Sequence, residues 1–128
     1  MRGILVAEEE QLRIALIGCG RAGLIHGRNF AGKVQGARLV ALSDANEQAL
    51  ASASDELRVA EAHSDYNAIL NNAAVDAVVV VTPTVLHEEI VTAAAKAGKH
   101  VFCEKPMAMN VREAEAMNAA ARKNGVKL

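Results

Sequence analysis

The segment Leu12 to Gly23, LRIALIGCGRAG, constrains the fold of this chain more than any other feature. An apolar, strand-like run leads directly into three glycines with the spacing G-x-G-x-x-G, at Gly18, Gly20 and Gly23. In a dinucleotide-binding unit the first glycine permits a tight turn, the second lets the backbone approach a pyrophosphate, and the third lets the helix pack closely. The next residues, Arg21 to Phe30, suit a helix whose free N–H groups face the phosphates. The segment therefore predicts a dinucleotide-binding loop.

An acidic residue at the expected distance supports this interpretation. A second apolar run, Ala37 to Ser43, ends in Asp44, which lies 21 positions after Gly23. In such folds an acid about 20 residues after the glycines accepts hydrogen bonds from the adenosine ribose. A carboxylate there repels a 2′-phosphate, and no lysine or arginine between Ser43 and Leu57 offsets that repulsion. We therefore expect NAD as the cofactor in preference to NADP.

Strand and helix patterns continue to alternate along the rest of the chain. Two helices are predicted at 46–57 and 65–71. A third helix is capped by Thr84 and ends at Gly98, and a fourth begins at a capping box formed by Asn110 and Glu113. The further predicted strands are 59–62, 75–81 and 99–103. The run 75–81, VDAVVVV, is typical of a central parallel strand buried on both faces. Alternating strands and helices indicate right-handed βαβ units. The predicted fold class is α/β, a Rossmann-type doubly wound parallel sheet in a single domain.

Composition excludes several other classes of protein. With 128 residues, 52% hydrophobic content and a net charge of −1, the chain suits one layered domain. One tyrosine, two phenylalanines and no tryptophan leave little for stacking on nucleic acid, so we expect no nucleic-acid partner. No apolar run reaches the roughly 20 residues of a membrane span, and the N-terminus does not resemble a signal peptide. We expect a cytoplasmic protein without a metal site or a membrane partner.

In a parallel sheet of this kind, ligands bind beyond the carboxyl ends of the strands. Four segments follow predicted strands directly: Gly18 to Ala22, Asp44 to Asn46, Thr82 to His87, and Glu104 to Met107. They are far apart in the sequence, yet the fold predicts that they converge on one edge of the sheet. This edge is the candidate site.

The residues of these segments also carry a family resemblance. GCGRAGLIH, SDAN, HSDY, VVVVTPTVLH and VFCEKPMAMN follow one another along the chain. The chain from about Leu12 to Leu128 thus resembles the N-terminal half of the glucose-fructose oxidoreductase / inositol dehydrogenase / MocA family. The most distinctive part is E-K-P at Glu104, Lys105 and Pro106, which follows T-P-x-x-x-H.

The resemblance implies a role for each matching residue. The glycine loop would hold the pyrophosphate, Asp44 the ribose, and the T-P-x-x-x-H residues the middle of the cofactor, while Glu104 and Lys105 would lie nearest the nicotinamide. Lys105 is the implied catalytic residue, because a cation there would favour a developing alkoxide. The expected cofactor-binding residues are Gly18, Gly20, Arg21, Ala22, Gly23, Asp44, Thr82, Pro83, His87, Glu104, Lys105 and Pro106.

Three residues are open to a second interpretation. Thr84 departs from the asparagine often found there in the family, which puts one cofactor contact in doubt. His26 is expected to pack or to lie on a helix surface, although family sequences often have a histidine there. His87 could face the cofactor or serve the structure.

The resemblance also implies a domain that this sequence does not contain. We expect residues 1–11 to form an N-terminal extension and 12–128 a dinucleotide-binding domain truncated at the start of a sixth strand, at Val126 to Leu128. Family members continue into a substrate domain, so the predicted function is the NAD-binding part of a dehydrogenase for a sugar, polyol or similar hydroxyl compound, with little turnover alone. The alternative is a standalone NAD-binding regulatory module that works through a partner. An uncovered sheet face would favour a homo-oligomer.

Overall fold

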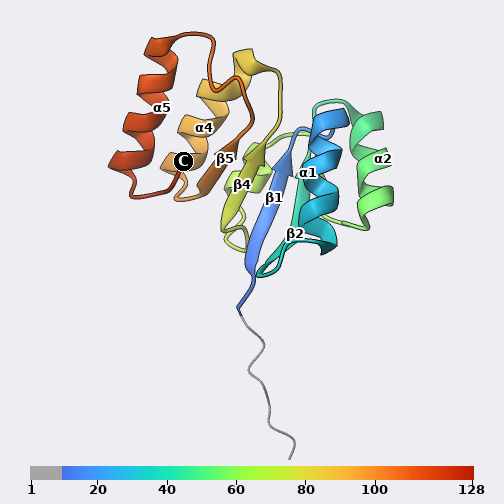
Figure 1. Ribbon diagram of the computed structural model, residues 1–128. Coiled ribbons are helices and arrows are strands. Elements are labelled where there is room, and N and C mark those ends of the chain that lie inside the picture. The colour runs from blue at the N-terminus through green and yellow to red at the C-terminus, as the bar shows by residue number, and fades with distance from the viewer. Residues whose placement is uncertain (1–9) are drawn as a thin grey trace, which may run out of the picture.

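Five parallel strands form one sheet in the order β3-β2-β1-β4-β5. The computed structural model describes residues 10–128 (Figure 1). The strands are β1 (Leu12–Ile17), β2 (Ala37–Ser43), β3 (Ala62–His63), β4 (Ala77–Val80) and β5 (His100–Cys103). The helices are α1 (Arg21–Gly32), α2 (Glu47–Leu57), α3 (Asn67–Leu70), α4 (His87–Lys96) and α5 (Val111–Lys123), and a 3-10 turn, η1 (Thr84–Leu86), precedes α4. This is the doubly wound sheet that the sequence predicts.

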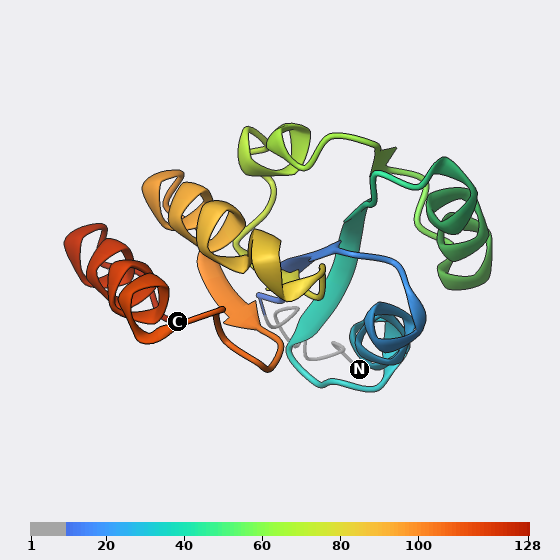
Figure 2. The same cartoon turned by 90° about the horizontal axis from the view of Figure 1, so that it is seen from above.

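The order of the strands reverses direction at β1. The chain first adds β2 and β3 on one side of β1, and then crosses over to add β4 and β5 on the other side. Figure 2 shows the result from above: α1 and α2 cover one face of the sheet, and α3, α4 and α5 cover the other. Ligands of such sheets bind at the carboxyl ends of the strands where the order reverses. Here that point lies between β1 and β4.

Each face of the sheet has its own hydrophobic core. Alternate residues of β1 and β4 point to opposite faces, so the apolar side chains of one strand serve both cores. On the α1 and α2 face the buried cluster includes Ile14, Leu16, Leu42, Leu50, Ala53, Leu57, Ala77 and Val79. On the opposite face it includes Ala15, Ile17, Ile69, Val78, Val80, Ile90, Val91, Val101 and Met117. All four residues of β4 are buried, as expected for a central strand.

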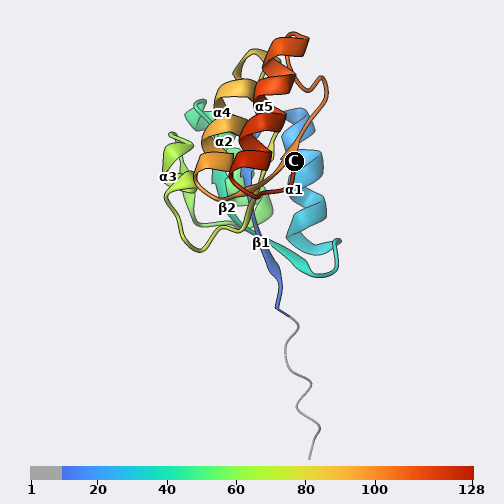
Figure 3. The ribbon, with the colours of Figure 1, turned by 90° about the vertical axis from the view of Figure 1, so that its left-hand side faces the viewer.

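The second face is built mainly by two helices that lie side by side in Figures 1 and 3, α4 and α5. Met117 of α5 is completely buried, and Ile90 and Val91 of α4 are within 1% of complete burial. The predicted capping box of α5 is confirmed, because Asn110 Oδ1 accepts a hydrogen bond of 2.9 Å from the Glu113 N–H. The Glu113 carboxylate accepts a hydrogen bond of 3.0 Å from the N–H of Met109, one residue before the Asn110 N–H that a capping box uses.

Some predicted boundaries were wrong, and the hydrogen bonds explain why. The strand predicted at 59–62 is β3, Ala62–His63, because Val59 belongs to a turn closed by hydrogen bonds to Ser54. The strand predicted at 75–81 is shorter, since Val75 N–H bonds to Asn72 in a turn. Thr84 does not cap α4; it is the first residue of η1, and neither η1 nor α4 has a side-chain cap.

The two ends of the sequence also bear on the predictions. The predicted extension, 1–11, lies mostly outside the described residues, and β1 begins at Leu12. At the other end Val126 to Leu128 run beside β5, where the Val101 N–H donates to the Lys127 carbonyl at 2.9 Å. This backbone hydrogen bond is of the kind that would pair β5 with the predicted sixth strand, although residues 126–128 do not form a strand.

An ion pair fastens β1 to the start of β4 at the edge opposite the candidate site. The Arg13 guanidinium donates to both carboxylate oxygens of Asp76, at 3.0 and 2.8 Å, and the backbone N–H of Arg13 donates to one of them at 2.8 Å. The hydrogen bond from the Arg13 side chain lowers the pKa of Asp76 from 3.8 to about 2. Because the folded state holds the ionised form, Asp76 contributes stability above its ordinary pKa, and this contribution is lost as the pH falls through about 2.

We predict that Asp76→Asn lowers the melting temperature near pH 7, and that the difference from the natural protein shrinks as the pH falls from about 4 to about 2. Thermal unfolding followed by circular dichroism across this range measures it. The exposed Asp55 of α2 provides the control, Asp55→Asn, which should change little at any pH. A deficit of the same size at every pH would contradict the assigned role of the ion pair.

Candidate functional site

The glycine loop connects β1 to α1 and has the close contacts that its spacing predicts. Gly18 has a positive φ of 104°, and a Cβ atom at this position would collide with the carbonyl group of Val81 after β4. A Cβ atom on Gly23 would overlap the Gly18 carbonyl oxygen, so only glycine lets α1 lie this close to the loop. A Cβ atom on Gly20 would meet nothing within 4 Å. The backbone of Gly20 therefore borders open space.

Helix α1 presents an N-terminus suited to an anion. Gly20 is its N-cap residue and provides no side-chain cap, and the first turn has no acidic residue. The first N–H groups of a helix have no partners within the helix, and the helix dipole favours negative charge there. Arg21 and Ala22 begin the helix and are both exposed. This end of α1 can bind a phosphate group.

Asp44 joins the glycine loop to the end of β2. One carboxylate oxygen accepts the Cys19 N–H at 2.7 Å, and the other accepts the Asn46 N–H at 2.8 Å. A carboxylate has about four lone-pair positions, so these two bonds leave acceptor capacity on each oxygen. Asp44 is half-buried, and Asn46 caps α2 by accepting the Ala49 N–H at 3.0 Å. Asp44 is thus fixed in place and still able to accept ribose hydroxyl groups.

The segment after β4 contains a polar atom without a partner. The hydroxyl oxygen of Thr82 is buried and forms no hydrogen bond in the described structure. A buried polar group normally has a partner, and its absence here needs an explanation. Together with the open space at Gly20, this hydroxyl fits a site that a dinucleotide completes. Pro83 follows it in extended conformation and is exposed.

His87 connects the segment after β4 to the segment after β5. It is only 1% exposed. Its Nε2 lies 2.9 Å from the carbonyl oxygen of Thr82, and its Nδ1 lies 3.0 Å from that of Pro106 and 3.2 Å from that of Met107. Both ring nitrogens therefore face backbone groups of the protein, which gives His87 a structural role at this edge.

The E-K-P segment begins where β5 ends. The Glu104 N–H donates to the Val80 carbonyl at 2.9 Å, which extends the pairing of β4 and β5 by one residue. The side chain of Glu104 accepts the Lys105 N–H at 2.9 Å and lies 2.6 Å from Nε2 of His26. Lys105 is exposed, and no hydrogen bond or ion pair holds its ammonium group within residues 10–128.

The four predicted segments thus lie at one edge of the sheet and are linked to one another. Asp44 joins the glycine loop to β2 by a hydrogen bond. His87 joins the loop after β4 to the E-K-P segment, and His26 joins the E-K-P segment to α1. Sequence reasoning did not assign His26 to the site. The sequence signal that could have assigned His26 to the site is its position three residues after Gly23, where a helical residue can point toward β5.

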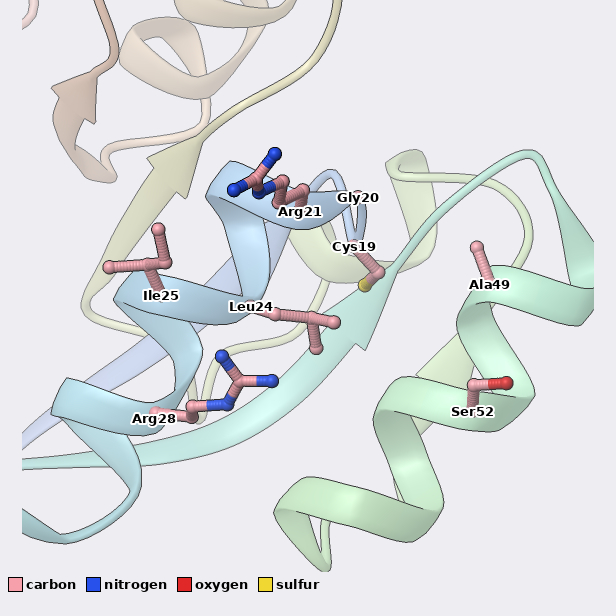
Figure 4. Close-up of a pocket in the computed structure, with 8 residues that line it drawn as sticks. All are labelled: Cys19, Gly20, Arg21, Leu24, Ile25, Arg28, Ala49 and Ser52. Carbon is pink, nitrogen blue, oxygen red and sulfur yellow. The ribbon is translucent and has the colours of Figure 1, made fainter.

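A hollow beside the glycine loop lies between α1 and α2 (Figure 4). It has a volume of about 610 Å³ and is lined by Cys19, Gly20, Arg21, Leu24, Ile25, Arg28, Ala49 and Ser52. Gly20 and Arg21 of the glycine loop line it, whereas Asp44 and Lys105 do not, so it overlaps the sheet-edge site at the loop alone. Burial, more than the nearby charge of Asp44, raises the pKa of the Cys19 thiol to about 12, which argues against a reactive thiolate there.

The described residues contain neither a helix that could cross a membrane nor a cluster of metal-binding side chains. No helix there combines the length and the apolar content that a membrane crossing requires. No group of three or more metal-binding side chains lies together among residues 10–128.

We predict that one glycine substitution in the loop mainly lowers stability and that another mainly weakens NADH binding. Gly23→Ala should lower the free energy of unfolding by about 3 kcal/mol, because its methyl group collides with backbone. Gly20→Ala should change that free energy by less than about 0.5 kcal/mol but weaken NADH binding at least tenfold, since its methyl group occupies the space open to the pyrophosphate. Urea unfolding and NADH fluorescence titration measure the two quantities. Undiminished binding by Gly20→Ala would contradict the site.

Comparison with known proteins agrees with this geometry. The chain is 40% identical over 115 residues to a myo-inositol 2-dehydrogenase of Thermotoga maritima and 34% identical over 118 residues to a scyllo-inositol 2-dehydrogenase (NAD(+)) of Bacillus subtilis. These alignments cover 90% and 92% of the chain but 34% of each relative. The chain therefore spans about a third of the length of the curated relatives it matches.

Solved structures give the same result. A crystal structure of scyllo-inositol dehydrogenase from Lactobacillus casei with bound NAD(H) and scyllo-inositol superposes with a TM-score of 0.84 and 34% identity, over 90% of this chain and 34% of that one. The family model described as an oxidoreductase family with an NAD-binding Rossmann fold matches residues 12–128. The chain belongs to this NAD-binding family, that of glucose-fructose oxidoreductase, inositol dehydrogenase and MocA.

Proposed function

We propose that this chain is the NAD-binding part of a dehydrogenase that oxidises a hydroxyl group of a sugar, polyol or related small molecule. The observation that carries the proposal is the linked set of four segments at the edge of the sheet, with Asp44 and Lys105 in separate segments of it. Relatives that are named inositol dehydrogenases, at 34–40% identity, support this substrate class.

The cofactor-binding residues act through backbone and charge. The N-terminus of α1 and the open backbone at Gly20 hold the pyrophosphate, and Asp44 accepts the ribose hydroxyl groups. The Asp44 carboxylate disfavours a 2′-phosphate, which is why NAD is the cofactor here in preference to NADP.

Lys105 would act at the nicotinamide end. NAD, when bound, would supply the nicotinamide ring that accepts a hydride from the substrate carbon. The Lys105 ammonium would donate a hydrogen bond to the substrate oxygen and favour its developing negative charge. No group that could accept the substrate's hydroxyl proton is free beside it among the described residues, because Glu104 binds the His26 imidazole and His87 is buried between carbonyl groups. We therefore expect weak turnover or none from this chain alone.

Calorimetric titration tests the proposal and its cofactor preference. NADH should bind the purified chain more tightly than NADPH, and Asp44→Ala should weaken NADH binding about tenfold or more through loss of the ribose contacts. Glu47→Ala, which changes an exposed acid at the start of α2, serves as the control. Equal binding of NADH by the natural protein and Asp44→Ala would contradict the role of Asp44, and no binding of either dinucleotide would contradict the proposed function.

Two predictions from the sequence remain proposals. One is a cytoplasmic location. The other is a homo-oligomer, formed through apolar side chains on the α1 side of the sheet. Ile25 and Phe102, which are 53% and 54% exposed, lie on this side. Sedimentation of the purified chain at tens of micromolar tests the second proposal, and a monomeric mass there would reject it. Phe102→Ser should lower the associated fraction.

A further inference from the structure

The carboxylate of Glu104 is occupied on both oxygens without any ligand. Oε2 lies 2.6 Å from Nε2 of His26, and Oε1 accepts the N–H of Lys105 at 2.9 Å. The side chains of His26 and Glu104 are partly buried, at 21% and 29% exposed. The hydrogen bond from His26 is the main reason that the pKa of Glu104 lies below its ordinary value. Glu104 therefore remains an anion between a helix and a lysine.

The pair joins two parts of the site that serve opposite ends of one ligand. His26 lies in the second turn of α1, and the proposed function assigns the first turn of that helix to the pyrophosphate. Glu104 directly precedes Lys105 and is itself tied to β4 through its N–H bond to Val80. The contact spans 78 residues of sequence. It fixes the start of the E-K-P segment relative to the phosphate-binding helix.

The imidazole of His26 is held in turn by an aromatic ring. The rings of His26 and Phe102 meet edge to face, with centroids 5.4 Å apart and an angle of 61° between their planes. Phe102 belongs to β5 and is otherwise exposed. Helix α1 thus reaches the end of β5 through one polar and one aromatic contact, both made by the same side chain.

We propose that His26 and Glu104 are positioning residues that set Lys105 at a fixed place relative to helix α1, so that its ammonium group meets the nicotinamide end of a dinucleotide bound by that helix. The inference rests on the proposed function and deepens it. Glu104 acts through the backbone of Lys105, not by direct contact with the ligand. The pair should then matter for a ligand with a nicotinamide group and not for one without it.

Binding of NADH and of ADP by the purified chain tests this. ADP keeps the adenosine and the diphosphate but lacks the nicotinamide and the ribose that carries it. His26→Phe removes the hydrogen bond to Glu104 and keeps a ring against Phe102, while His26→Gln restores an N–H donor. The chain offers a control in His63, a half-buried histidine of β3 that lies 3.3 Å from Glu61, as His63→Phe. Circular dichroism confirms the folding of each variant, and Glu104→Gln is the second variant of the pair.

We expect His26→Phe to bind NADH about tenfold more weakly and ADP within about twofold of the natural protein. His26→Gln should recover part of the NADH affinity, Glu104→Gln should lose less than His26→Phe, and His63→Phe should bind both ligands normally. In a Lys105→Ala background His26→Phe should have no further effect on NADH, because the pair acts through Lys105.

Three outcomes would overturn the inference. An equal loss of NADH and ADP affinity in His26→Phe would make the pair a support of the whole fold. A full tenfold effect that persists in the Lys105→Ala background would separate the pair from the lysine. Unchanged NADH binding in both His26→Phe and Glu104→Gln would remove the role altogether. Failure of the natural protein to bind either ligand would instead reject the proposed function, and this inference with it.

Discussion

The whole site depends on the close approach of helix α1 to the end of strand β1. Gly23 and Gly18 meet backbone to backbone, with no room for a side chain between them. This contact places the N-terminus of α1 at the carboxyl edge of the sheet, where its free N–H groups are available. It also sets the direction of α1, which brings His26 within hydrogen-bonding distance of Glu104 after β5. The proposed binding of a phosphate and the proposed placement of Lys105 thus depend on the same contact.

Around this contact the site is held by polar groups that bridge segments distant in the sequence. Asp44 links the glycine loop to β2, and His87 links the segments after β4 and β5. Such bonds give exposed loops fixed positions without extending the hydrophobic core. They leave few groups free, and those include the Thr82 hydroxyl and the Lys105 ammonium. A rigid frame with a few unpaired groups is what orientation of a ligand requires.

Most of the fold could be predicted because its signals are local. The glycine spacing, the β-branched run of β4 and the Asn110 cap each determine a conformation within a few residues. Boundaries failed where a turn competed with a strand, as at Val59, whose N–H and carbonyl group both bond to Ser54. The candidate site was predicted as a set of segments because parallel strands end at one edge. The partners of individual side chains were not predicted.

The sequence by itself determined the alternation of strands and helices, the dinucleotide loop, the acid at Asp44 and the family to which the chain belongs. These follow from periodicity and short spacings, which act over one element and its neighbour. Only the tertiary structure decided that His87 is buried between two loops and that Glu104 binds His26, 78 residues away. The physical reason is that a hydrogen bond between distant residues depends on how helices pack on the sheet, which no local pattern encodes.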